Sequence, residues 1–206
     1  IEKLISTKKN IICEKPLSVN YLDTKKIVSL WKKKKQIFLI NFCYNFFLPF
    51  NIFLNEIKSN KLQIKKIEIS WRVLSNYSQF KGYWKNDNSL TGGVLFNYGS
   101  HLLNLFFPKK KKLKIKIKKT KLPYNICNFS IKDKFLYNFY LSNVSKPPYG
   151  IKFKIIGKHG KIIISNLNSK GPTSGFIKYF EHNFNKKIIK KKINFDSEKK
   201  INLHDL

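Results

Sequence analysis

Residues 10–44 read NIICEKPLSVNYLDTKKIVSLWKKKKQIFLINFCY, and this pattern decides the fold. A short apolar run, residues 10–13, ends at a Glu-Lys-Pro turn. A helix is expected from Asn20, because Asp23 stands three positions later in a variant of the capping box. An apolar stripe and four lysines complete this helix, and a second buried strand is expected at residues 37–44. Strand, turn, helix and strand in this order predict a β-α-β unit with parallel strands, the closing part of a doubly wound domain.

The pattern changes after residue 44. Apolar spacing suits a helix from residue 48, and two more helices are expected at residues 94–107 and 176–190. Strands are expected at residues 64–71, 113–119, 134–142, 151–157 and 161–165, with a hairpin turn at Lys158-His159-Gly160 between the last two. This content predicts a mostly antiparallel sheet with helices packed on one face. The expected fold class is therefore α/β plus α+β, with a partial Rossmann domain at residues 1–44 and an α+β domain at residues 45–206.

The 206 residues carry a formal net charge of +31, which ordinarily indicates a polyanionic partner. Of the 42 basic residues only Arg72 is arginine, whereas nucleic-acid sites favour the planar fork of arginine. Alanine is absent and residues with A- and T-rich codons are abundant, so we interpret the lysine excess mainly as drift in genomic composition. No nucleic-acid partner is expected. A lysine-rich module that binds nucleic acid or an anionic surface stays open as an alternative.

Lysines alternate with apolar residues at 113–118, and a solvated edge strand protected by charge is the preferred interpretation.

Cysteine spacing and hydropathy indicate a cytoplasmic protein. Cys13, Cys43 and Cys127 are widely spaced, so they are expected to be reduced and buried, and no metal site is expected. Residues 36–55 are uncharged and approach the roughly 20 residues that span a bilayer. Asparagines and a proline interrupt them, so two buried elements explain the run better, and no membrane association is expected. The chain begins with Ile1, which favours a start within a domain.

Two short motifs supply a lysine and a histidine. The first, Cys13-Glu14-Lys15-Pro16-Leu17, follows the first expected strand, at the edge where ligands bind in open α/β sheets. The second, Gly92-Gly93-Val94-Leu95-Phe96-Asn97-Tyr98-Gly99-Ser100-His101, leads into an expected helix. With Tyr83-Trp84-Lys85, these motifs resemble, in the same order, segments of the glucose-fructose oxidoreductase, inositol dehydrogenase and rhizopine-catabolism (Gfo/Idh/MocA) family. The resemblance covers the chain from about residue 11 to residue 184.

The resemblance implies a dehydrogenase that uses NAD or NADP and oxidises a secondary hydroxyl of a sugar, cyclitol or nucleotide-sugar. It implies that Glu14, Lys15 and Pro16 border the cofactor, that Lys15 polarises the substrate oxygen and that His101 takes its proton. These residue types suit the chemistry, because histidine titrates near working pH and an ammonium stabilises a developing alkoxide. The implied substrate-binding residues are Trp84, Lys85, Asn97 and Tyr98. Relatives associate through the outer face of their sheet, so a homo-oligomer formed through residues 45–206 is a further expectation.

Other interpretations of these residues stay open. Without the Glu-Lys-Pro motif, His101 would more often be a structural or surface residue, and Trp84 and Tyr98 either stack on a sugar or fill the core. Many relatives have aspartate at the position of Asn97 and arginine at that of Phe46. The glycine-rich turn and the ribose-binding acid of relatives lie upstream of the matched region, so this chain alone is expected to bind the cofactor poorly. A degenerate, inactive family member is therefore a third alternative.

Overall fold

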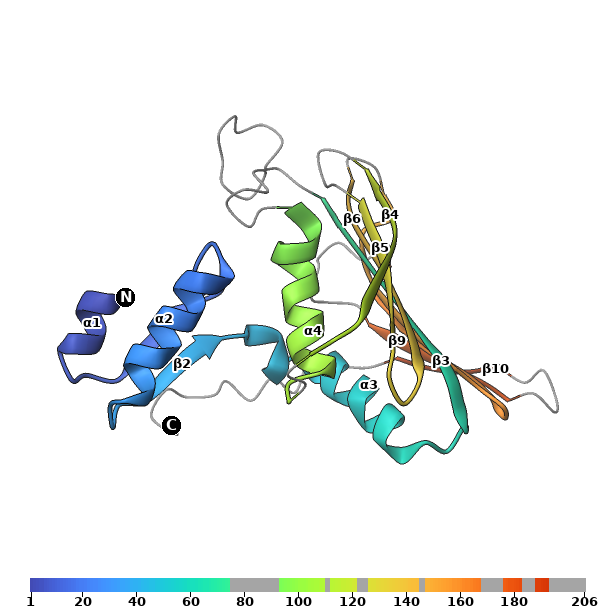
Figure 1. The fold of residues 1–206 in the computed structure, drawn as a ribbon. Coiled ribbons are helices and arrows are strands. Elements are labelled where there is room, and N and C mark those ends of the chain that lie inside the picture. The colour runs from blue at the N-terminus through green and yellow to red at the C-terminus, as the bar shows by residue number, and fades with distance from the viewer. Residues whose placement is uncertain are drawn as a thin grey trace.

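The computed structural model describes residues 1–74, 93–109, 112–121, 126–144, 147–167, 176–182 and 188–192. Within these residues the chain forms a two-stranded sheet and an eight-stranded sheet, here termed the small sheet and the large sheet. Helices α3 and α4 lie between the two sheets in Figure 1.

The small sheet pairs β1 (Ile11–Glu14) with β2 (Phe38–Asn41) in parallel. Helix α2 (Tyr21–Lys32) connects them, and a short helix, α1 (Glu2–Ser6), precedes them. The side chain of Asn20 caps α2 by accepting a 2.8 Å hydrogen bond from the Asp23 amide, as the sequence predicts. A small core joins these elements and contains Ile5, Ile11, Leu17 and Ile27. The strand-helix-strand prediction is therefore confirmed.

The second strand is shorter than the expected residues 37–44. The amide of Phe42 bonds back to the carbonyl of Ile40, which forms a turn and ends the ladder at Asn41. A 3₁₀ helix, η1 (Cys43–Phe46), follows and leads directly towards α3. The division into domains at residues 44 and 45 stays a prediction.

The large sheet has the strand order β10-β9-β8-β7-β3-β6-β5-β4. Every neighbouring pair is antiparallel except β3 and β6, which run parallel at the centre of the sheet. Its strands are β3 (Ile64–Leu74), β4 (Ile115–Lys121), β5 (Ile126–Lys132), β6 (Leu136–Val144), β7 (Gly150–Gly157), β8 (Gly160–Ser165), β9 (Ile177–His182) and β10 (Ile188–Lys192). The expected fold class, a parallel α/β unit followed by a mostly antiparallel sheet, is confirmed.

Helices α3 (Leu48–Ser59) and α4 (Ser100–Phe106) cover one face of the large sheet (Figure 1). Phe50 and Phe53 of α3 pack on Phe153 of β7 with ring centroids 4.9 and 4.5 Å apart, and all three are fully buried. Alternate strand residues, such as Ile67 and Ile69 of β3, complete this core. The opposite face of the sheet, here termed the open face, is covered by no described helix (Figure 1).

The prediction of a helix at residues 176–190 is wrong. Residues 177–182 form β9 and residues 188–192 form β10, which pair as an antiparallel ladder. Strand β9 also pairs with β8. Its backbone groups form hydrogen bonds with the edge of β8, which a helix at these residues would leave unpaired. Strand β5 and helix α1 were not expected, although burial alternates over the first four residues of β5 as it should in a strand.

Other expectations have mixed outcomes. The alternating lysines belong to β4, which is an edge strand as predicted. The hairpin is confirmed, with Gly157 opposite Gly160 across the turn. The three cysteines are free, but Cys43 is exposed and only Cys127 is buried, so their common burial is wrong. Among the described residues, no helix has the length and apolarity required to cross a bilayer.

Candidate active site

Lys15 follows the last residue of β1, and its side chain reaches the segment that precedes α4. Its ammonium donates a 2.5 Å hydrogen bond to the backbone carbonyl of Asn97, and the Lys15–Pro16 peptide is cis. The carboxyl ends of parallel strands are the edge where open α/β sheets bind ligands. The structure therefore brings the first motif against the second, as the sequence analysis expects.

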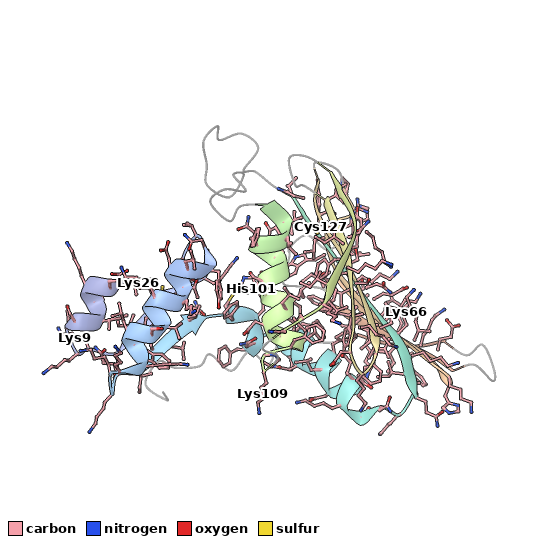
Figure 2. All side chains as sticks on the ribbon, viewed as in Figure 1. Lys9, Lys26, Lys66, His101, Lys109 and Cys127 are labelled. Atoms are coloured by element: carbon pink, nitrogen blue, oxygen red, sulfur yellow. The ribbon has the colours of Figure 1, made fainter. Side chains whose placement is uncertain are left out.

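His101 belongs to the first turn of α4 and is buried, with 6% of its surface exposed. Its ring meets Tyr44 edge-on at 4.8 Å and Phe42 edge-on at 5.7 Å, and lies 6.4 Å from Trp71 at a tilt. We term Phe42, Tyr44 and Trp71 the aromatic cage. Figure 2 shows His101 on α4, the helix that separates the small sheet from the large one.

Burial lowers the pKa of His101 to about 4, and the positive charge of Lys15 contributes to the same shift. The imidazole is therefore neutral at physiological pH, and one ring nitrogen can accept a proton. The expectation that His101 titrates near working pH is wrong, because burial lowers its pKa too far. Its Nδ1 atom is buried and has no hydrogen-bond partner among the described residues. A buried nitrogen without a partner is unusual in a folded protein.

The helix that carries His101 begins with an irregular turn. The sequence predicts a helix at residues 94–107, and the structure forms it with a π-helical segment, η5 (Leu95–Gly99), before α4. The Ser100 amide bonds to the carbonyl of Leu95, five residues back, and the Ser100 hydroxyl donates to the carbonyl of Phe96. Gly93 has φ of 81°, which favours glycine at the entrance to this helix. Such π turns occur frequently at functional sites.

The other predicted residues have different positions. Glu14 accepts a 2.7 Å hydrogen bond from Asn41 across the small sheet, and Pro16 is exposed. Asn97 contacts Lys15 through its backbone carbonyl, and Tyr98 packs against the core with its ring 5.3 Å from Trp71. For Tyr98 the geometry favours the core-filling interpretation. Trp84 and Lys85, like Gly92, lie outside the described residues.

The aromatic cage was not predicted. Tyr44 also stacks on Phe50 at 5.3 Å and meets Trp71 edge-on at 4.9 Å, so it ties His101 to the core. Burial, together with the charge of Cys43, raises the pKa of Tyr44 to about 12, which keeps its hydroxyl protonated. In a chain with 18 Phe and 10 Tyr, no local signal marks Phe42 or Tyr44 as neighbours of His101.

Comparison with known proteins shows similarity in fold. No protein-family model matches the sequence, and no curated protein matches it. A levoglucosan dehydrogenase in complex with NADH matches with a TM-score of 0.68 and 14% identity over 93% of this chain and 56% of its own. The WlbA dehydrogenase from Bordetella pertussis, in complex with NADH and UDP-GlcNAcA, has a TM-score of 0.67 and 10% identity over 83% of this chain and 56% of its own.

A mutant of KijD10, a 3-ketoreductase from Actinomadura kijaniata in complex with TDP-benzene and NADP, has a TM-score of 0.70. It is 10% identical over 93% of this chain and 60% of its own. The chain thus spans little more than half the length of these structures. At such identities the likeness establishes a fold that NAD(P)-dependent oxidoreductases also have, and nothing finer.

Proposed function

We propose that this chain is part of a nicotinamide-dependent oxidoreductase of the Gfo/Idh/MocA family that acts on a secondary hydroxyl of a sugar, cyclitol or nucleotide-sugar. One observation carries the proposal: an ammonium and a neutral, buried imidazole, 86 positions apart in the sequence at Lys15 and His101, interact electrostatically beside one helix turn. A dehydrogenase for secondary alcohols needs both groups at the reacting carbon.

The proposed roles follow from the charge of each group. His101 is neutral, so it can take the hydroxyl proton, with Nδ1 as the buried atom that lacks a partner. Lys15 is cationic and half-buried, so it stabilises negative charge that develops on the same oxygen. Alcohol oxidation releases one proton, to His101, and one hydride, which the nicotinamide accepts when it is bound.

The residues around Lys15 fit a cofactor at this edge. Glu14 is the last residue of β1, and Lys15 and Pro16 follow it, at the side of the small sheet where dinucleotides bind in doubly wound folds. The solved structures with the same fold contain NADH or NADP, which supports NAD or NADP here. One of these proteins is a levoglucosan dehydrogenase and another is a dehydrogenase in complex with UDP-GlcNAcA, which supports the substrate class.

The test measures hydride transfer by the gene product that contains these 206 residues, with NAD and NADP and a panel of sugars, cyclitols and nucleotide-sugars. His101→Asn and Lys15→Met are each expected to lower kcat at least about 100-fold, the usual range for lost acid-base or electrostatic assistance. Lys25→Met removes the same charge from an exposed position of α2 and is expected to leave kcat unchanged. Equal activity of all four proteins would contradict the proposal.

A second copy that packs on the large sheet, and the inactive or nucleic-acid-binding alternatives, stay predictions. The nucleic-acid-binding alternative predicts lysines clustered on one face of the molecule. This alternative would be favoured if the protein bound duplex DNA with a steep salt dependence and showed no hydride transfer.

A further inference from the structure

Two runs of lysine meet at one edge of the small sheet. They lie at the end of α1, in residues 7–10 before β1, and at the end of α2, in residues 33–37 before β2. Because β1 and β2 are parallel, both loops lie at the same edge, opposite the edge that Lys15 follows. Six lysines, here termed the basic edge, gather there: Lys8, Lys9, Lys32, Lys33, Lys34 and Lys35. Figure 2 shows Lys9 at the outer end of the small sheet, far from His101.

Hydrogen bonds hold the two loops against each other. The side-chain amide of Gln36 donates a 2.8 Å bond to the carbonyl of Lys9. The side-chain oxygen of Asn10 accepts a 3.0 Å bond from the amide of Ile37. The indole of Trp31 donates to the carbonyl of Gln36 and so anchors the second loop to α2. The backbone of the basic edge is therefore braced from both strands, while all six lysine side chains are exposed.

No acid among the described residues forms an ion pair with the basic edge. Residues 1–47 contain three acids, Glu2, Glu14 and Asp23. Glu2 pairs with Lys26 at 3.0 Å, and Glu14 ends β1 at the opposite edge. Asp23 lies in the first turn of α2, at the other end of that helix from the lysines. The carboxyl end of a helix supplies only about half an elementary negative charge, so the basic edge keeps a strong positive potential.

Lys8 has a backbone conformation that lysine rarely adopts. Its φ is 59°, in the left-handed region, directly after the C-cap residue Thr7 of α1. Glycine and asparagine adopt this conformation at less cost, and the turn that ends α3 has Asn60 with φ of 48°. Asparagine also has A- and T-rich codons, so drift in composition does not by itself select lysine over asparagine at this turn. The lysine therefore indicates that its charge has a use.

The basic edge lacks the groups that recognise nucleic-acid bases. It contains no arginine, and the aromatic residue beside it, Trp31, is partly buried with its ring 5.9 Å from that of Phe38. Specific nucleic-acid sites use the fork of arginine, and single-strand sites use exposed aromatic rings that stack on bases. Ile37, which follows the second run of lysines, is instead an aliphatic side chain that is 63% exposed. Lysines beside an exposed aliphatic side chain suit an anionic lipid surface.

We propose that the basic edge docks the protein on a membrane surface that carries anionic phospholipids. The six ammonium groups attract the negatively charged leaflet within a Debye length, about 8 Å at physiological ionic strength. Ile37 adds an apolar contact at the lipid interface. Such docking is peripheral and needs no helix that crosses the bilayer. The opposite edge, followed by Lys15, faces away from the membrane, so this proposal stands apart from the proposed function.

Flotation of the gene product with phosphatidylcholine vesicles, with and without phosphatidylserine, tests the proposal at physiological ionic strength. The test variant removes four charges of the basic edge: Lys8→Gln/Lys9→Gln/Lys34→Gln/Lys35→Gln. The control variant removes four charges from exposed positions outside the small sheet: Lys58→Gln/Lys61→Gln/Lys65→Gln/Lys132→Gln. Binding is expected only with phosphatidylserine. The test variant should weaken it at least about thirtyfold and the control variant at most about threefold.

Two single variants separate charge, fold and lipid contact. Lys8→Asn removes one charge and suits the left-handed turn, so it should weaken vesicle binding without lowering the thermal midpoint of unfolding. Ile37→Ser removes the aliphatic contact and should also weaken vesicle binding. Equal losses in the two four-lysine variants, or no gain in binding from phosphatidylserine, would overturn the proposal. So would tighter binding of an RNA or DNA oligonucleotide that the test variant loses and Ile37→Ser keeps, because the basic edge would then bind nucleic acid.

Discussion

The ammonium of Lys15 donates a hydrogen bond to the backbone carbonyl of Asn97, which joins the end of β1 to the π-helical turn before His101. The bond links the small sheet to the helix that covers the large sheet. It also places a positive charge close enough to lower the pKa of His101. This pair therefore connects the architecture of the chain with the electrostatics of the candidate site.

Lys15→Met is expected to raise the pKa of His101 above its value of about 4, because the positive charge of Lys15 contributes to the shift. The pKa should stay below the ordinary 6.5, since burial is the larger cause. Titration of the histidine ring signals by NMR, assigned with His101→Asn, measures it. Lys25→Met is the control and should leave the signal of His101 unchanged. An unchanged pKa in Lys15→Met would contradict the electrostatic link.

His101 should make the protein less stable in mild acid. In the folded state the pKa of His101 is lowered from 6.5 to about 4. Between these two pH values the unfolded state therefore binds a proton at this histidine and the folded state does not. The stability that comes from this neutral imidazole is complete above pH 6.5 and is lost as the pH falls to about 4. The shift corresponds to a loss on the order of 3 kcal/mol.

Urea unfolding at pH 7.5 and pH 4.5, compared between the wild type and His101→Gln, isolates this effect, because all carboxylates are common to both proteins. The wild type should lose more stability than the variant between the two pH values. Parallel losses would show that His101 does not titrate abnormally.

The aromatic cage should keep water from His101. Tyr44→Ala removes a ring that contacts Phe50, Trp71 and the imidazole, and it is expected to lower the free energy of unfolding by about 2–4 kcal/mol. It should also raise the pKa of His101, since burial is the main cause of the low value. Tyr44→Phe keeps the ring and should change neither quantity appreciably. Denaturant unfolding and the same NMR titration measure both.

Phe153 holds α3 against the large sheet. Phe153→Ala is expected to destabilise the protein by about 3–5 kcal/mol, because the fully buried ring packs on both Phe50 and Phe53. Phe46→Ala is the matched control, since that ring is 80% exposed and its loss should cost less than about 0.5 kcal/mol. Urea midpoints of the two variants compare them directly, and similar midpoints would refute the assignment of the core.

Gly157 leaves no room for a side chain. A Cβ atom there would overlap the carbonyl oxygen of Leu62, so Gly157→Ala must move backbone and is expected to destabilise the protein by about 2 kcal/mol or more. Gly99→Ala would meet only the side-chain ends of Leu95 and Leu141 at 3.0 Å, which can adjust. Thermal unfolding should therefore rank Gly157→Ala as clearly the less stable of the two.

The sequence predicted those parts of the fold that depend on local signals. The cap at Asn20 and the two strands around α2 have such signals, and both are present. The expected burial of the second strand is wrong, because no residue of β2 is buried and Leu39 is exposed. A helix was predicted at residues 176–190 because Phe176, Ile177 and Phe180 have helical spacing. In the structure residues 177–182 instead form a strand that pairs with the edge of β8. Tertiary pairing of this kind involves residues far away in the sequence, so no local pattern reports it.

The candidate site was predicted to a similar extent. Motif order placed Lys15 and His101 together, and the structure does bring them together, while their catalytic roles stay a prediction. The aromatic cage and the backbone contact of Asn97 depend on a π turn and on packing between distant elements. Neither has a signature in the residue order.

The parallel pair β3 and β6 at the centre of the large sheet has a consequence for biosynthesis. Lys66 of β3 pairs with Leu136 on one side and with Ile156 on the other, so both partners leave the ribosome long after β3 does. Until then β3 presents two unpaired edges in a chain that emerges at about 5–20 residues per second. We expect nascent chains that end before β7 to be the species that chaperones bind and that aggregates most readily.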